Sequence, residues 1–539
     1  MRKSVTAKQL KTALRDGKEM ALIDVREEGV FSAAHTLFAC CIPLSRIELD
    51  VERLVPRKDT RIVLIDEGDD GLVEPAAEKL MQLGYSDVAV MQGGMKAWSD
   101  AGLEVFSGVN VPSKAFGEFV EQTYHTPHIA ASDLKVRMDR GDNLVILDSR
   151  PIEEFRRMHI PTGIDAPGAE LVYRVHDAAP DPNTLVVVNC AGRTRSIIGA
   201  QSLINAGIPN KVMALENGTM GWHLAGEELA AGEEHRRAPL PSADGLAKAK
   251  QSAARVAKRF GVKFTDGATL AKWQAERDRT LFLLDVRAPE EYAQGHLPEC
   301  GNAPGGQLVQ ATDEYVGVRN ARIVLVDDTQ VRAIMTASWL VQMGWTDVHV
   351  LKGGIAGMAL TTALPAHVQS KMPQPEIPSA EMISPRQLQT LLADPSVAVI
   401  DLGTSVKFRD KHIPGAWWAV RSRLKAALAK VSAQTPMPKQ LVLVSPDGVL
   451  AQLAAGDLKA SHPKLPVRVL QGGSRAWFAT NLPSESGIER ATTTTNDVWY
   501  KPYENRDAME QSMRDYITWE IALVPKIARD GDANFKAFS

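Results

Sequence analysis

Short apolar runs and segments with helical spacing alternate along the whole chain. The most apolar runs each end in a polar residue and are RIVLID (61–66), TLVVVN (184–189), RIVLVD (322–327) and QLVLVS (440–445). Each is followed by a turn and then a helical pattern such as SIIGAQSLINAG (196–207). Capping patterns at Thr6 with Gln9, and at Ser384 to Gln387, predict two further helix starts. Continuous apolar strands that alternate with helices predict a mostly parallel sheet covered on both faces.

The pattern repeats four times. Each repeat has an apolar strand ending in Asp, an aromatic residue seven positions later, and a His four further on; the Asp residues are Asp24, Asp148, Asp285 and Asp401. Each repeat closes with a related signature: VMQGGMKAW (90–98), ALENGTMGW (214–222), VLKGGIAGM (350–358) and VLQGGSRAW (469–477). The repeats are 124, 137 and 116 residues apart, which is the size of a compact domain. We therefore expect four homologous α/β domains.

The repeats set the expected domain boundaries. We place the domains at 1–108, 109–240, 241–372 and 373–490, followed by a C-terminal tail at 491–539. Linkers are expected around 107–116, 236–245 and the proline-rich segment 371–382. In the tail, residues 508–527 have apolar positions at helical spacing, so we expect a helix that packs on its own chain or on a partner.

Composition excludes several classes of protein. The chain is 44% hydrophobic and 24% charged with a net charge of −3, so it has no basic excess for nucleic-acid binding. Neither a signal peptide nor a run of about 18 apolar residues is present. We therefore expect no membrane partner, and we expect a cytoplasmic location. The four cysteines, Cys40, Cys41, Cys190 and Cys300, are too few for a disulfide framework and form no CxxC pair. We expect reduced thiols and no metal or other cofactor.

One turn carries the candidate chemistry, in the segment VVVNCAGRTRSIIGAQSL (186–203). Cys190 stands where a buried strand ends, and the residues after it lead directly into a helix. Backbone N–H groups, the positive end of the helix dipole, and the charges of Arg193 and Arg195 favour a thiolate there. Ala191 and Gly192 let the backbone curl around a bound anion. Cys190 is therefore the candidate nucleophile.

This loop, together with the DxR, HIP and NG/GG signatures, resembles the rhodanese family, and the scaffold signatures cover roughly residues 1–490. The resemblance implies four tandem rhodanese-like domains, each a mostly parallel central sheet flanked by helices. It also implies that Cys190 accepts a sulfane sulfur from a donor such as thiosulfate and passes it, as a persulfide, to cyanide or a thiol. The expected substrate-binding residues are Ala191, Gly192, Arg193, Thr194, Arg195 and Ser196.

Loop length bears on the alternatives. Four residues separate Cys190 from Arg195, whereas phosphatases of similar fold place five between their cysteine and arginine. The shorter loop favours sulfur chemistry over a phosphatase or arsenate reductase. The two arginines favour a dianion such as thiosulfate over mercaptopyruvate, whose enzymes have a differently composed loop, while glutathione persulfide stays open as a donor. A non-enzymatic scaffold of rhodanese domains is a further alternative.

The other three loops lack the nucleophile. Asp327 takes the cysteine position in the third domain, with Arg332 at the position of Arg195. The equivalent residue is Asp66 or Glu67 in the first domain and Ser445 or Pro446 in the fourth. A carboxylate would repel an anionic donor, so these three domains are expected to be non-catalytic.

Several other positions have a simpler structural interpretation. Asp148, Arg150 and His159 recur in repeats that lack a cysteine, so we expect them to support the fold and do not assign His159 as a base. Cys40, Cys41 and Cys300 are expected to be core or rim residues. Glu170, Tyr173 and Arg174 are expected near the donor or acceptor, and a protein is one further candidate for the sulfur acceptor.

Overall fold

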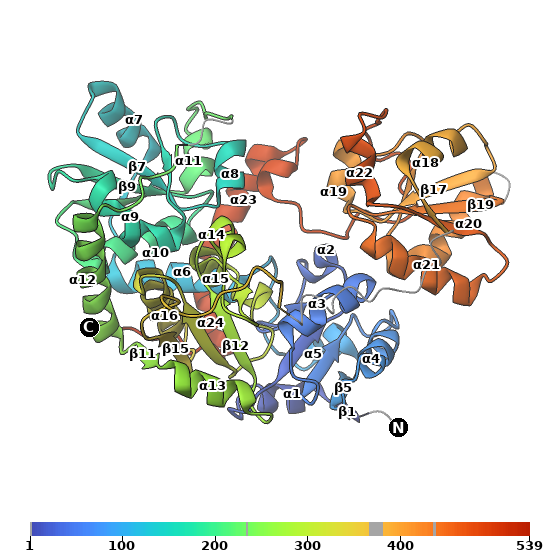
Figure 1. The fold of residues 1–539 in the computed structure, drawn as a ribbon, viewed down its shortest axis with the longest axis horizontal. Coiled ribbons are helices and arrows are strands. Elements are labelled where there is room, and N and C mark those ends of the chain that lie inside the picture. The colour runs from blue at the N-terminus through green and yellow to red at the C-terminus, as the bar shows by residue number, and fades with distance from the viewer. Residues whose placement is uncertain (1–2, 233–235, 366–380, 435–437, 539) are drawn as a thin grey trace.

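The computed structural model describes residues 3–232, 236–365, 381–434 and 438–538 (Figure 1). They form four sheets of five strands, and every strand pairing is parallel. The sheets share one strand order: β1-β5-β4-β2-β3, β6-β10-β9-β7-β8, β11-β15-β14-β12-β13 and β16-β20-β19-β17-β18. The expected α/β class and the fourfold repeat are confirmed.

The first two domains have helices and strands in the same order, except that the second begins with an additional helix, α6. The first contains β1 (Lys3–Val5), α1 (Ala7–Ala13), β2 (Ala21–Asp24), α2 (Glu28–Phe31), β3 (Cys40–Cys41), α3 (Ile47–Leu54), β4 (Ile62–Ile65), α4 (Val73–Gln82), β5 (Val88–Met91) and α5 (Gly94–Asp100). The second contains α6 (Val111–Tyr124), β6 (His128–Ile129), α7 (Ala131–Arg140), β7 (Leu144–Asp148), α8 (Ile152–Arg157), β8 (Ile164–Asp165), α9 (Leu171–Ala178), β9 (Leu185–Asn189), α10 (Thr194–Ala206), β10 (Val212–Leu215) and α11 (Gly218–Leu224).

The third domain contains α12 (Ala243–Phe260), β11 (Lys263–Thr265), α13 (Gly267–Ala275), β12 (Leu281–Asp285), α14 (Pro289–Gln294), β13 (Gly301–Asn302), α15 (Gly305–Gln310), β14 (Arg322–Val326), α16 (Val331–Gln342) and β15 (Val348–Leu351). The fourth contains β16 (Met382–Ile383), α18 (Pro385–Leu391), β17 (Val397–Asp401), α19 (Ser405–Asp410), β18 (Trp417–Trp418), α20 (Leu424–Gln434), β19 (Gln440–Val444), α21 (Val449–Ser461), β20 (Val467–Leu470) and α22 (Gly473–Ala479). The tail adds a 3-10 turn, η6 (Pro502–Glu504), and the helices α23 (Met509–Ile521) and α24 (Leu523–Asp530).

The predicted local signals are present. Thr6 and Gln9 form a capping box at the start of α1, and Ser384 and Gln387 form another at α18. The central strands β4, β9, β14 and β19 are buried almost throughout, as expected for strands with helices on both sides.

The first of the expected linkers differs from the structure, whereas residues 236–242 of the second contain no helix or named strand. In 107–116 the chain is already helical from Val111, where α6 begins, and Phe116 is buried. The reason is that Val111 and Ala115 pack with apolar residues of the tail helix α24, while Phe116 joins the large cluster that includes α10. Most of the proline-rich segment 371–382 lies outside the described residues. None of the helices in the described ranges is long and apolar enough to cross a membrane.

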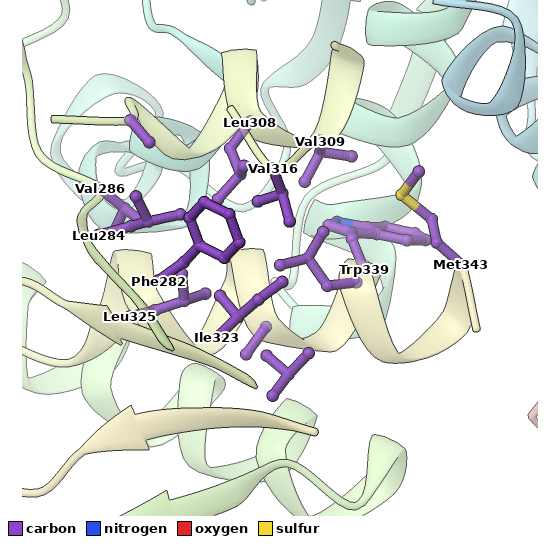
Figure 2. Packing of buried hydrophobic residues seen from close by; sticks show 14 of the residues in the cluster. Phe282, Leu284, Val286, Leu308, Val309, Val316, Ile323, Leu325, Trp339 and Met343 are labelled. Carbon is purple, nitrogen blue, oxygen red and sulfur yellow. The ribbon is translucent and has the colours of Figure 1, made fainter. Parts of the chain in front are cut away.

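The buried apolar residues are divided unevenly between the domains. One continuous cluster joins the first three domains, and Figure 2 shows the part of it that packs around Phe282, Leu284 and Trp339. Trp339 also donates from Nε1 to Ser202 Oγ of α10 over 2.8 Å. The fourth domain has two clusters of its own. The first three domains therefore form one body, which the fourth joins through polar contacts.

Candidate functional site

Cys190 lies directly after β9, at the carboxyl end of a strand between β7 and β10. Its side chain is 2% exposed, and its Sγ lies 3.5 Å from Ser196 Oγ, to which it donates a hydrogen bond. Residues 191–193 turn the chain into α10. The thiol therefore stands at the N-terminus of a 13-residue helix, where the helix dipole favours negative charge.

The closing signature of the repeat supports this loop. The N–H of Thr219 donates to the carbonyl of Cys190 over 2.8 Å, and the N–H of Met220 donates to that of Ala191 over 3.0 Å. Gly218, directly before Thr219, has φ +58°, and a Cβ there would lie 2.3 Å from the Cys190 carbonyl oxygen. This turn requires glycine both for its backbone conformation and for the close approach of the loop.

The sheet register identifies the equivalent residues in the other domains. Asp148 pairs with Asn189, Asp24 with Ile65 and Asp401 with Val444. The residue that matches Cys190 is therefore Asp66 in the first domain and Ser445 in the fourth, which removes the ambiguity left by the sequence.

The loops differ in what their backbone amides bind. The Asp66 carboxylate accepts from the N–H groups of Leu72 and Val73, and the Asp327 carboxylate accepts from those of Gln330 and Arg332. In the second domain, no acceptor among the described residues receives a hydrogen bond from the N–H groups of residues 191–196. The amides of this loop are thus available to a bound anion.

Arg193 is turned away from Cys190. Its guanidinium donates to both carboxylate oxygens of Glu118 over 2.7 and 2.9 Å, and it also binds Glu121 and the side chain of Asn217. Burial works against its charge, but the Glu118 carboxylate outweighs burial and raises the pKa of Arg193. Arg193 therefore ties the loop to α6 and is not a solvated charge.

Arg195 faces the cavity above the loop and forms two hydrogen bonds to Glu154 of α8, of 2.9 and 2.8 Å. Burial alone would raise the pKa of Glu154, but Arg195 outweighs it and lowers this pKa to about 2. Arg332 and Glu291 form the same pair in the third domain. The pair is therefore part of the shared scaffold as well as of the site.

The C-terminal tail covers the loop. Figure 1 shows the tail leaving the fourth domain and returning to the second, where α23 contacts α6. Glu520 of α23 accepts from Thr194 Oγ1 over 2.9 Å and from the Tyr516 hydroxyl over 3.0 Å. A Cβ at Gly192 would lie 3.2 Å from both Glu520 and Tyr516. The helical spacing predicted a packed tail helix, but nothing in it indicated this target.

A cavity of about 800 Å³ opens above the loop. Ala191 and Arg195 line it from the second domain and Gln307 from the third, while its other walls come from the first domain, the fourth domain and the tail. It is far larger than a thiosulfate ion. Every domain therefore contributes to the surroundings of the one loop that carries a cysteine.

Asp148, Arg150 and His159, which we predicted to support the fold, form contacts that recur in other domains. Both oxygens of Asp148 accept from the Arg150 guanidinium, which also donates to the carbonyl of Met158. His159 stacks on Phe155 with ring centroids 4.1 Å apart. The Asp–Arg pair recurs as Asp24–Arg26 and Asp285–Arg287, and the stacked His recurs in all four domains.

The remaining cysteines are structural. Cys40 and Cys300 are buried, Cys41 is half-buried, and burial raises the pKa of all three thiols. No cluster of three or more metal-ligating side chains occurs within the described residues.

The segment around Glu170 lies elsewhere, contrary to expectation. Glu170 binds Arg174 and the third domain's Arg332, and Tyr173 lies against the same guanidinium. Glu170 and Arg174 line a second cavity, of about 560 Å³, between the second and third domains. We expected these residues near the donor or acceptor, but none of them lines the cavity above the loop, because the cation of the third domain draws Glu170 into the domain interface.

Comparisons with known proteins agree with the fold. The chain matches the Rhodanese-like domain over residues 6–101, 130–225, 268–360 and 384–480. It is similar over its full length to the crystal structure of a thiosulfate sulfurtransferase from Pseudomonas aeruginosa, with 47% identity, a TM-score of 0.91 and complete coverage of both chains. It is also 30% identical over 275 residues to the "Putative thiosulfate sulfurtransferase" of Synechococcus elongatus, which covers 40% of this chain and 84% of that protein.

Proposed function

The chain belongs to the rhodanese family, and we propose that its second domain transfers the outer sulfur of thiosulfate to a thiophilic acceptor through a persulfide on Cys190. The contrast between the loops carries this proposal. In the first and third domains an aspartate occupies the amides of the loop, whereas in the second domain a cysteine stands there and the amides remain available to an anion.

The reaction follows a ping-pong course. The Cys190 thiolate attacks the outer sulfur of thiosulfate, the S–S bond of the donor breaks, and sulfite leaves with the bonding electron pair. Backbone N–H groups of residues 191–196 bind the anionic donor and then the persulfide, and Arg195 faces the same space. A thiolate or cyanide then attacks the outer sulfur of the persulfide and regenerates Cys190.

Membership of the family implies a sulfur donor and a sulfur acceptor. Thiosulfate as donor, and cyanide, a small thiol or a protein thiol as acceptor, belong to the proposal, as does a cytoplasmic location, which the free state of all four cysteines supports. The cavity volume of about 800 Å³ is sufficient for an acceptor much larger than cyanide.

Mass spectrometry of the protein after treatment with thiosulfate tests the proposal. We expect one added sulfur atom on Cys190, formation of thiocyanate when cyanide follows, and loss of both in Cys190→Ser. Cys300→Ser and Cys41→Ser serve as controls and should keep most of the activity, because Cys300 is buried in a core cluster of the third domain and Cys41 lies on β3 of the first domain. Substantial transfer by Cys190→Ser, or turnover of an aryl phosphate or arsenate in place of thiosulfate, would overturn the proposal.

A further inference from the structure

The charges nearest to Cys190 do not by themselves attract an anion. Arg193 is neutralised by Glu118 and Glu121, and Arg195 by Glu154. Glu520, which is fully buried, adds a carboxylate next to Gly192. The Nζ atom of Lys114 lies 3.7 Å from Oε1 of this carboxylate. Side-chain cations on this side of the cavity are therefore matched or outnumbered by carboxylates.

On the opposite wall of the cavity, cations outnumber carboxylates. Among the described residues that line the cavity, the fourth domain and the tail contribute four cations and two carboxylates: Lys407, Arg409, Lys501, Arg506, Asp410 and Glu504. Arg409 and Arg506 both bind Asp410, and Lys407 is exposed to solvent. Lys501 is half-buried and forms no salt bridge with any described residue.

The tail fixes the position of Lys501. Its backbone N–H donates to Glu504 Oε2 over 3.0 Å, Pro502 follows it at the start of η6, and its ammonium lies 5.9 Å from the centre of the Tyr503 ring. Burial works against its charge, but Tyr503 and the carboxylates of Glu154 and Glu504 outweigh burial and raise the pKa of Lys501. Lys501 therefore stays cationic at neutral pH, close to the pair formed by Glu154 and Arg195.

We propose that Lys501, carried by the C-terminal tail, is a substrate-binding residue of the second domain's site, where its ammonium group draws the anionic sulfur donor toward Cys190. In a partly enclosed cavity a cation without a paired carboxylate raises the local concentration of anions much more than a cation on an open surface does. The proposal rests on the proposed function and deepens it: a segment outside all four repeats supplies the charge that the loop's own arginines do not.

Alkylation of Cys190 by two reagents of similar size tests the role of Lys501 in a reaction that does not depend on sulfur transfer. Iodoacetate carries a negative charge and iodoacetamide does not, so the ratio of their rates measures the potential at the thiol. In Lys501→Gln we expect the iodoacetate to iodoacetamide ratio to fall by roughly 3- to 10-fold, and KM for thiosulfate to rise with kcat less affected. General damage to the fold changes both rates together and leaves the ratio unchanged.

Two further variants complete the experiment. Lys501→Arg keeps the charge and should restore the ratio. Lys536→Gln removes the same charge from an exposed position of the tail and should not alter it. An unchanged ratio in Lys501→Gln overturns the role of Lys501. A native protein whose Cys190 reacts with iodoacetamide but takes up no sulfur from thiosulfate contradicts the proposed function instead.

Discussion

Glu154 and Arg195 show how one pair of side chains can serve both the scaffold and the site. The guanidinium is held by two hydrogen bonds, and the equivalent pair, Glu291 and Arg332, is kept in a domain whose loop has Asp327 in place of the cysteine. The pair therefore fixes the start of the helix after the loop. In the second domain this also fixes where a cation stands relative to Cys190.

Glu154→Gln should release Arg195 and lower kcat/KM for thiosulfate by roughly 10- to 100-fold, because small displacements of a positioned group are costly. Since both partners are partly exposed, we expect a loss of only about 1–3 kcal/mol in unfolding free energy. Steady-state kinetics and chemical denaturation measure the two effects. Glu291→Gln is the matched control and should lower stability without comparable loss of activity. Equal loss of activity in both variants would show that the pair acts only through stability.

At the scale of elements, the turn that follows the last strand of each repeat fixes the carbonyl that opens the loop. In each domain a glycine with positive φ precedes the N–H that donates to this carbonyl: Thr219 to Cys190, Met95 to Asp66, Ile355 to Asp327 and Ser474 to Ser445. The GG and NG signatures therefore repeat because a backbone contact repeats, whether or not the loop is catalytic.

Gly218→Ala should displace the Cys190 carbonyl, because the new Cβ would lie 2.3 Å from its oxygen on a backbone with φ +58°. We expect a loss of about 1–3 kcal/mol in stability together with loss of sulfur transfer at temperatures where the protein remains folded. Gly354→Ala places the new Cβ 2.2 Å from the Asp327 carbonyl oxygen at φ +60° in the third domain. Thermal unfolding and transfer assays should find it similarly destabilised but active; an inactive Gly354→Ala would contradict this.

At the scale of the whole molecule, the fourth domain is held to the first by a polar contact. Arg421 donates to both oxygens of Glu48 over 2.8 and 2.9 Å and to Asp457 over 2.8 Å. The adjoining Lys79 also binds Glu48. Burial would raise the pKa of Glu48, but Arg421 outweighs it and lowers this pKa to about 2. This contact holds the cavity wall formed by the fourth domain in position.

Arg421→Ala should loosen the fourth domain and move Lys407 and Arg409 away from the loop. We expect KM for thiosulfate to rise several-fold with a smaller change in kcat, since Cys190 and its amides are untouched, and part of the protein should unfold at a lower denaturant concentration. Lys425→Ala, on an exposed position of the same domain, is the control and should change neither quantity. An Arg421→Ala protein with unaltered KM would show that this contact does not shape the site.

The sequence alone was sufficient for the repeats, the parallel sheets and the identity of the cysteine loop. Strand burial, helix caps and the glycine turn depend on residues close together in the chain, so their signals are local and repeat four times. The same reasoning predicted that Asp148, Arg150 and His159 support the fold, because these residues recur in repeats whose loop lacks the cysteine.

Only the tertiary structure decided which residues bind the polar and charged side chains of the loop. Arg195 meets Glu154 across 41 residues, Arg193 meets Glu118 across 75, and Thr194 meets Glu520 across 326. No periodicity connects such distant positions, because each pairing arises when separate elements pack together. The sequence thus predicted which residue is the candidate nucleophile, and packing determined which carboxylates bind the arginines of its loop and that the tail covers this loop.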